Sequence, residues 1–136
     1  MTDLRIPQRI IAAMTEQARR EAPLEACGIL SGRDGVALTL HEMTNADASE
    51  EHFTMLPAEQ FAVAKRIRAA NEEMLAVYHS HPASPARPSR EDIRLAFMPD
   101  MIYVILSLLD PKRPDVKGFR MDGDDVVAVA LEITDE

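Results

Sequence analysis

The sequence feature that most constrains the fold is the apolar run Met101–Leu109, MIYVILSLL. It has the length of a strand, and a strand that is apolar on both faces is typical of the interior of a sheet. The run therefore predicts a sheet with this segment near its centre.

The other expected elements are helices and strands in a mixed order. Helical periodicity predicts amphipathic helices over Pro7–Glu21 and Pro57–Glu73, and a shorter helix from about Ser89 to Phe97. Short segments between turn signals predict five further strands, which are Ala26–Ser31, Val36–Met43, Met74–His81 (buried at its start), Val116–Met121 and Val126–Ile133. The last two are joined by an Asp-Gly-Asp-Asp turn, a hairpin signal. We expect one domain over residues 1–136, of mixed α/β (α+β) class, with a largely antiparallel sheet flanked by helices.

Composition limits the functions open to such a domain. The net charge of −8 at pH 7 argues against non-specific nucleic-acid binding, which needs a surplus of lysine and arginine. The single cysteine, Cys27, excludes an intramolecular disulfide and fits a reducing compartment. The N-terminus is too polar for a signal peptide, and no apolar run has the length that spans a bilayer. We expect a cytoplasmic protein with no nucleic-acid or membrane partner, and the oligomeric state stays open.

Two histidines at the end of a predicted strand indicate a metal site. Residues i and i+2 of a strand share a face, so His79 and His81 can reach one ion while Ser80 points away. Asp92 follows near the start of the next predicted helix, after a proline-rich loop that can bring this helix back over the strand. Two imidazoles, a carboxylate and a vacant position make the ligand set of a catalytic zinc ion. The segment Ser89–Asp92 also fits a helix N-cap, and the two uses are compatible.

A hydrolytic metal site also needs a group that transfers a proton. Glu25 is the candidate by position, because it directly precedes the apolar strand and would be held at a strand edge. A solvated loop carboxylate is the alternative interpretation, and position alone leaves it open.

Two segments, PLEACGILSG (residues 23–32) and HSHPASPARPSRED (residues 79–92), together resemble the JAMM (MPN+) metalloprotease family. The family pattern is a glutamate before the first strand, then His-x-His, seven residues and Ser-x-x-Asp, and this chain matches it throughout. The resemblance includes the stretch Thr44–Phe53 and covers essentially the whole chain. It implies a JAMM/MPN-like fold with a cytidine-deaminase-like arrangement of layers.

The resemblance also implies roles for individual residues. By it, His79, His81 and Asp92 would be the ligands of a Zn²⁺ cofactor, and Glu25 the general acid/base beside the catalytic water. Ser89 would donate a hydrogen bond to the oxyanion of the tetrahedral intermediate.

The segment between Ser107 and Phe119 holds only a short turn, without the long insertions by which eukaryotic family members grip ubiquitin. The chain is therefore most similar to the compact prokaryotic branch of the family. This implies a zinc metallopeptidase that hydrolyses a peptide or isopeptide bond at the C-terminal Gly-Gly tail of a ubiquitin-like sulfur-carrier protein.

Two other functions are compatible with the sequence. RadC-like proteins, which are associated with DNA repair, share the H-x-H-P…P-S-x-x-D segment, although the Glu-Ala-Cys-Gly strand and the acidic charge fit them less well. A non-catalytic module that binds a ubiquitin-like partner through the same groove would also retain the site. Outside the motif, we expect Cys27 to be a small buried core residue, His41 to be structural and His52 to lie on the surface near the groove.

Overall fold

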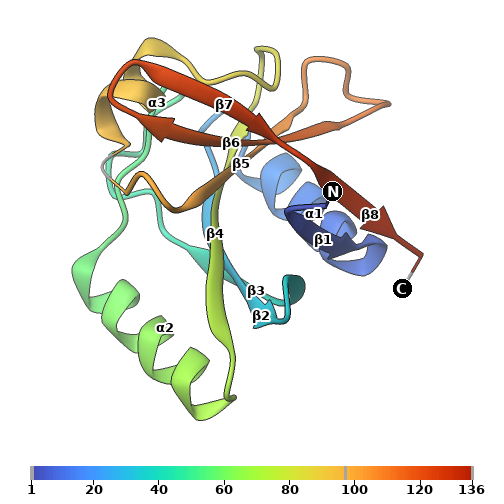
Figure 1. The fold of residues 1–136 in the computed structure, drawn as a ribbon. Coiled ribbons are helices and arrows are strands. Elements are labelled where there is room, and N and C mark those ends of the chain that lie inside the picture. The colour runs from blue at the N-terminus through green and yellow to red at the C-terminus, as the bar shows by residue number, and fades with distance from the viewer. Residues whose placement is uncertain (1, 97, 136) are drawn as a thin grey trace.

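The chain folds around one curved sheet with helices on both of its faces (Figure 1). The computed structural model describes residues 2–96 and 98–135. The strands are β1 (Leu4–Pro7), β2 (Cys27–Arg33), β3 (Val36–Met43), β4 (Glu73–His81), β5 (Ile102–Ser107), β6 (Asp115–Asp122), β7 (Asp125–Val129) and β8 (Leu131–Thr134). Their order in the sheet is β7-β6-β5-β4-β2-β3-β1-β8. Within the described residues, β2–β3, β2–β4, β5–β6 and β6–β7 are antiparallel, and β1–β3, β1–β8 and β4–β5 are parallel. The expected largely antiparallel, mixed sheet is confirmed.

The two edge strands of the sheet, β7 and β8, are neighbours in sequence and are separated by Ala130 alone. The carbonyl of Ala130 accepts hydrogen bonds from the Asp3 and Leu4 amides, and its own N–H donates to the Asp3 carboxylate. The chain therefore pairs with β6 as β7, changes partner at Ala130 and then pairs with β1 as β8. The β1–β8 pairing is parallel, with Leu4 opposite Leu131. The prediction of one continuous strand over Val126–Ile133 is wrong at this residue, and β1 was not predicted.

Helices α1 (Gln8–Glu21) and α2 (Pro57–Ala69) cover opposite faces of the sheet (Figure 1). Alternate residues of β4 show this division, because Ala76 and Tyr78 pack in the cluster with α1, whereas Val77 packs in the cluster with α2. The side chain of Tyr78 also donates a hydrogen bond to the carbonyl of Met14 in α1, at 3.0 Å. The even and odd residues of β4 therefore serve two different cores.

Helix α2 ends four residues before the predicted end at Glu73, because the chain turns at Asn71 with a φ of 56°. The guanidinium of Arg33 donates to the carbonyls of Ala70 and Asn71 and holds this turn. Helix α3 spans Arg90–Leu95, and the predicted end at Phe97 lies outside the described residues. No helix among residues 2–96 and 98–135 is long and apolar enough to cross a membrane.

Strand β4 is exposed where it begins and buried where it ends, which is the reverse of the prediction. Met74 is 37% exposed, whereas His79 and His81 are 1% and 3% exposed. The strand is flanked by β2 and β5, so both histidines lie deep inside the sheet rather than at an edge.

We expect Gly32→Ala to destabilise the fold strongly. Gly32 lies at an irregularity in the β2–β3 pairing, and a Cβ atom there would lie 1.8 Å from the carbonyl oxygen of Val36. Urea unfolding should show a loss of about 3 kcal/mol or more in the free energy of unfolding. Gly35→Ala is the matched control, because no atom lies within 4 Å of its Cβ position and only its φ of +76° is unfavourable. That variant should lose only about 1 kcal/mol, and equal losses in the two variants would contradict this account.

Candidate metal centre

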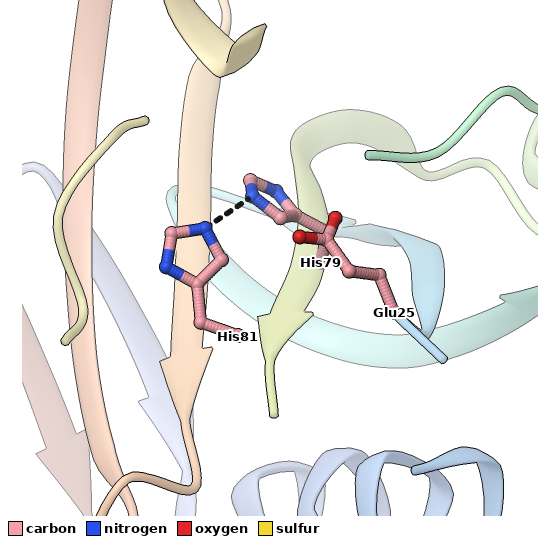
Figure 2. Close-up of side chains that lie close together, drawn as sticks. All are labelled: Glu25, His79 and His81. Atoms are coloured by element: carbon pink, nitrogen blue, oxygen red, sulfur yellow. Dashed lines mark hydrogen bonds between the residues drawn. The ribbon is translucent and has the colours of Figure 1, made fainter. Parts of the chain in front are cut away.

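The two histidines at the end of β4 face one another inside the sheet. His79 lies opposite Cys27 of β2 and Ile105 of β5, so strands on both sides hold its backbone. The Nε2 atoms of His79 and His81 lie 3.2 Å apart (Figure 2). Glu25, which comes two residues before β2, points its carboxylate toward this pair. One ligand atom of each of these three side chains lies within 4.8 Å of the other two.

Asp92 reaches the same place from α3. Its Oδ1 lies 3.2 Å from the Nε2 of His79, and its Oδ2 lies 3.0 Å from the Nε2 of His81. The residue also belongs to a capping box, in which its amide donates to the Ser89 hydroxyl and its carboxylate accepts from the Ser89 amide. The helix cap and the approach to the histidines therefore occur together, and the cap holds Asp92 in place.

The rigid loop between β4 and α3 orients one of the imidazoles. The Nδ1 of His81 lies 2.7 Å from the carbonyl oxygen of Pro85, so this nitrogen must carry a proton and donate it. In the neutral ring the lone pair of Nε2 then points at the Asp92 carboxylate and at His79. These facing atoms need either a proton on the Nε2 of one histidine or a metal ion between them. The donor set thus fits a cation, and two nitrogens with a carboxylate suit zinc.

Burial and mutual contact shift the pKa values of these groups. Burial and the nearby Asp92 charge raise the pKa of Glu25 to about 8. Burial disfavours the charged form of Asp92, but hydrogen bonds from both histidines hold its pKa well below the usual range. Burial lowers the pKa of His81, but its contacts with Asp92 and Pro85 raise this pKa by more. The pKa of His81 therefore lies above its ordinary value. The two carboxyl groups therefore differ, with Asp92 anionic and Glu25 able to bind or release a proton near neutral pH.

Two buried polar atoms of this centre have no hydrogen-bond partner within the part of the chain that the structure describes. They are Oε1 of Glu25 and Nδ1 of His79. A buried unpaired carboxylate oxygen is costly in a purely structural role. The solvated-loop alternative for Glu25 is also excluded, because this side chain is only 3% exposed.

An apolar pocket of about 450 Å³ adjoins the centre on the α2 side of the sheet. His79 and Asp92 form part of its wall, and most of the remainder is apolar. The apolar lining comes from Phe53, Met55, Val77, Leu95, Ala96, Met98, Tyr103 and Met121. Polar side chains at its wall include Thr54, Gln60 and Arg94. The pocket offers space for a large apolar group next to the candidate ligands.

The sequence did not assign roles to three residues that contact the centre. The hydroxyl of Ser80 accepts a hydrogen bond from the amide of Ala26 and so ties the residue after Glu25 to the histidine strand. Phe53 stacks on the ring of His79 with centroids 4.9 Å apart. Asn45, which belongs to the Thr44–Phe53 stretch of the resemblance, donates to the carbonyl of Glu25. The family resemblance included this stretch, but only the contacts in the structure show that it holds the Glu25 backbone and the His79 ring.

Cys27, His41 and His52, for which the sequence also gave expectations, lie outside the metal centre. Cys27 is fully buried between the α2-side core residues. The Nε2 of His41 lies 2.8 Å from the hydroxyl of Ser31, away from the metal centre on β3. The ring of His52 lies 3.0 Å from the carboxylate of Asp47 and is not part of the pocket wall.

Comparison with known proteins identifies the class to which this fold and site belong. The family model for prokaryotic homologues of the JAB domain matches residues 7–122. The CysO-cysteine peptidase of Mycobacterium tuberculosis is 39% identical over 114 residues, which cover 82% of this chain and 78% of that protein. A desampylase of Haloferax volcanii is 32% identical over 102 residues, or 72% of this chain and 73% of that one.

Solved structures have the same fold. A protein from Desulfitobacterium hafniense, determined in solution, is 40% identical and superposes with a TM-score of 0.91, covering 98% of this chain and 94% of that one. The fold is also that of a JAB1/MPN domain protein from Archaeoglobus fulgidus, which is 21% identical and superposes with a TM-score of 0.67 over 98% of this chain and 100% of that one. The chain belongs to the prokaryotic JAB family, which confirms the JAMM resemblance.

We expect the thiol of Cys27 to be inert in the folded protein. Burial raises its pKa to about 12, so almost no thiolate is present at pH 8. Labelling with iodoacetamide, followed by intact mass, should be about 100-fold slower in the native protein than in urea. Comparable native and denatured rates would show that the thiol is accessible and would contradict its burial.

Proposed function

We propose that this protein is a zinc metallopeptidase that hydrolyses the bond at the C-terminal tail of a ubiquitin-like sulfur-carrier protein. The observation that carries the proposal is the meeting of two imidazoles and two carboxylates with different pKa values at the buried end of β4. The relatives support the reaction class, because a CysO-cysteine peptidase and a desampylase share the larger part of the chain.

His79, His81 and Asp92 would hold the zinc ion. The anionic state of Asp92 and its contacts with both Nε2 atoms suit it to be the third ligand. Glu25 is close enough to belong to a ligand group with the histidines, but its raised pKa suits a group that exchanges a proton. A zinc ion held there would polarise the scissile carbonyl and make an attacking water more acidic.

Glu25 takes one proton from the attacking water and passes it to the nitrogen of the departing amine. The water oxygen bonds to the carbonyl carbon while the carbon–nitrogen bond breaks, which leaves a carboxylic acid on the carrier and a free amine. The hydroxyl of Ser89 donates a hydrogen bond to the carbonyl oxygen as negative charge develops on it. Its oxygen already accepts from the Asp92 amide, so its own proton is available to the substrate.

The substrate class follows from the centre and its neighbouring pocket. A Gly-Gly tail can pass the buried centre because glycine has no side chain to exclude. The apolar pocket beside His79 suits a larger apolar side chain of the carrier close to the tail. The same proposal includes a single catalytic domain over residues 1–136, since β1 and β8 join the two ends of the chain in one sheet. It also includes a cytoplasmic location, where the lone thiol stays reduced.

The direct test is intact-mass analysis of a ubiquitin-like sulfur carrier with residues added after its Gly-Gly end. The zinc-loaded protein should shorten this carrier to the Gly-Gly end, and chelator treatment should abolish the change until zinc is restored. Glu25→Gln should lower kcat by about 10³-fold while zinc, measured by elemental analysis, stays bound. Asp92→Ala should lose the zinc together with the activity.

The two variants separate the roles of the carboxylates. If Glu25→Gln lost the zinc and Asp92→Ala kept it, Glu25 would be the ligand and Asp92 the base, contrary to the proposal. Stoichiometric zinc without hydrolysis of any extended carrier would overturn the peptidase and favour the module that only binds a ubiquitin-like partner. Tight binding of duplex DNA at physiological salt would instead favour the RadC-like alternative.

The pocket is tested by filling it. Met98 lines it, and Met98→Trp should raise KM for the extended carrier by about tenfold without loss of zinc. Met74→Trp is the matched control, because Met74 is 37% exposed at the far end of β4 and lies outside the pocket wall. Equal kinetics of the two variants, with equal melting temperatures, would show that the substrate does not use the pocket.

A further inference from the structure

The side chain of Asn45 bonds to several separate parts of the loop 44–56 and to Glu25. It is 9% exposed. Its Nδ2 lies 3.1 Å from the carbonyl oxygen of Glu25, 3.0 Å from that of His52 and 3.4 Å from that of Ser49. Its Oδ1 accepts hydrogen bonds from the amides of Asp47 and Thr54, at 3.1 and 3.3 Å, and so completes the network.

The loop in turn holds the backbone of Glu25. The amide of Glu25 donates to the carbonyl of Ser49 at 2.8 Å, so both backbone groups of this residue are engaged by the loop. Asn45 and Ser49 therefore hold the two backbone groups of Glu25 from the same loop. The carboxylate of Glu25 has no comparable restraint, since its Oε1 has no partner within the described residues.

The far side of the same loop reaches the metal centre and the pocket. Asn45 forms an isolated bridge with Met55, and the residues just before Met55 are Phe53, which stacks on His79, and Thr54. Phe53, Thr54 and Met55 all line the pocket. One buried amide thus lies between the group that would transfer the proton and the wall that would hold the substrate.

We propose that Asn45 is a positioning residue that couples the pocket wall to Glu25, and that it sets the placement of the catalytic carboxylate. The inference rests on the proposed peptidase function for its kinetic consequence. An amide suits this position because its two N–H groups serve the carbonyls of Glu25 and His52 while its oxygen accepts from two backbone amides. A carboxylate would place negative charge against the three carbonyls. An alanine would leave the carbonyls of Glu25 and His52 and the amides of Asp47 and Thr54 unsatisfied, whereas the Ser49 carbonyl would keep the Glu25 amide.

Asp47 provides the matched comparison in the same loop. Its carboxylate binds the ring of His52 and the hydroxyl of Thr54, at 3.0 and 2.7 Å, and its side chain is 35% exposed. It therefore restrains the loop from the solvent side, and it is not among the recorded hydrogen-bond partners of Glu25. Asp47→Ala loosens the loop without removing the contact that the proposal concerns.

The first readout needs no activity. Amide hydrogen exchange by NMR on the zinc-loaded protein should show the Glu25 amide exchanging at least about tenfold faster in Asn45→Ala than in wild type. The Ala26 amide, which donates to the Ser80 hydroxyl, serves as the internal reference and should change by less than about threefold. Asp47→Ala should leave both amides within about threefold of wild type. Asn45→Asp, which has the same shape, replaces Asn45→Ala if the latter does not fold.

The second readout is kinetic. A displaced general base lowers kcat, so Asn45→Ala should lose about 10²-fold in kcat with one zinc ion still bound, whereas Asp47→Ala should keep kcat within about twofold. Unchanged Glu25 exchange in Asn45→Ala would overturn the inference, as would an equal loss of kcat in Asp47→Ala. If wild type cleaves no extended carrier, the proposed function falls by itself, and the exchange experiment alone decides whether Asn45 holds Glu25.

Discussion

The burial of four ionisable side chains at the end of β4 is the constraint on which the rest of the structure depends. An isolated buried charge is expensive, and such groups persist only where they compensate one another. Here Asp92 faces both imidazoles, and the carbonyl of Pro85 and the capping box of α3 hold the two partners in place. Strands β2 and β5 on either side of β4 supply the rigid frame that such a cluster needs.

The sequence predicted that His79, His81 and Asp92 would lie near one another, because they are close in the chain. The spacing of His79 and His81 is the period of a strand, and the Ser89–Asp92 pattern is that of a helix start, so local geometry alone brought them near to one another. Glu25 was a candidate from its position before the apolar strand, and the family resemblance supported its role. Its approach to the histidines depends on the pairing of Cys27 with His79 across two strands. Asn45 had no assigned role, because an asparagine in a polar loop carries no signal until its five backbone partners are known.

Two errors in the predicted fold share one physical cause, which is contact between segments that lie far apart in the sequence. The short strand β1 is extended because it pairs with β8 and β3, and its four residues show no convincing period of their own. The predicted end of α2 at Glu73 was wrong because Arg33, at the end of β2, stabilises the turn at Asn71. Helical periodicity could not report a contact made from outside the helix.

The junction at Ala130 places β8 at the edge of the sheet, far from β4 at its centre. Leu4 and Leu131 come from opposite ends of the chain, so their pairing closes a very long loop and is expected to form late in folding. Strand β4, by contrast, has three strands on one side and four on the other. Strand β8 lies at the edge of the sheet and its Ile133 is 43% exposed, so local opening there need not disturb the histidines at the centre.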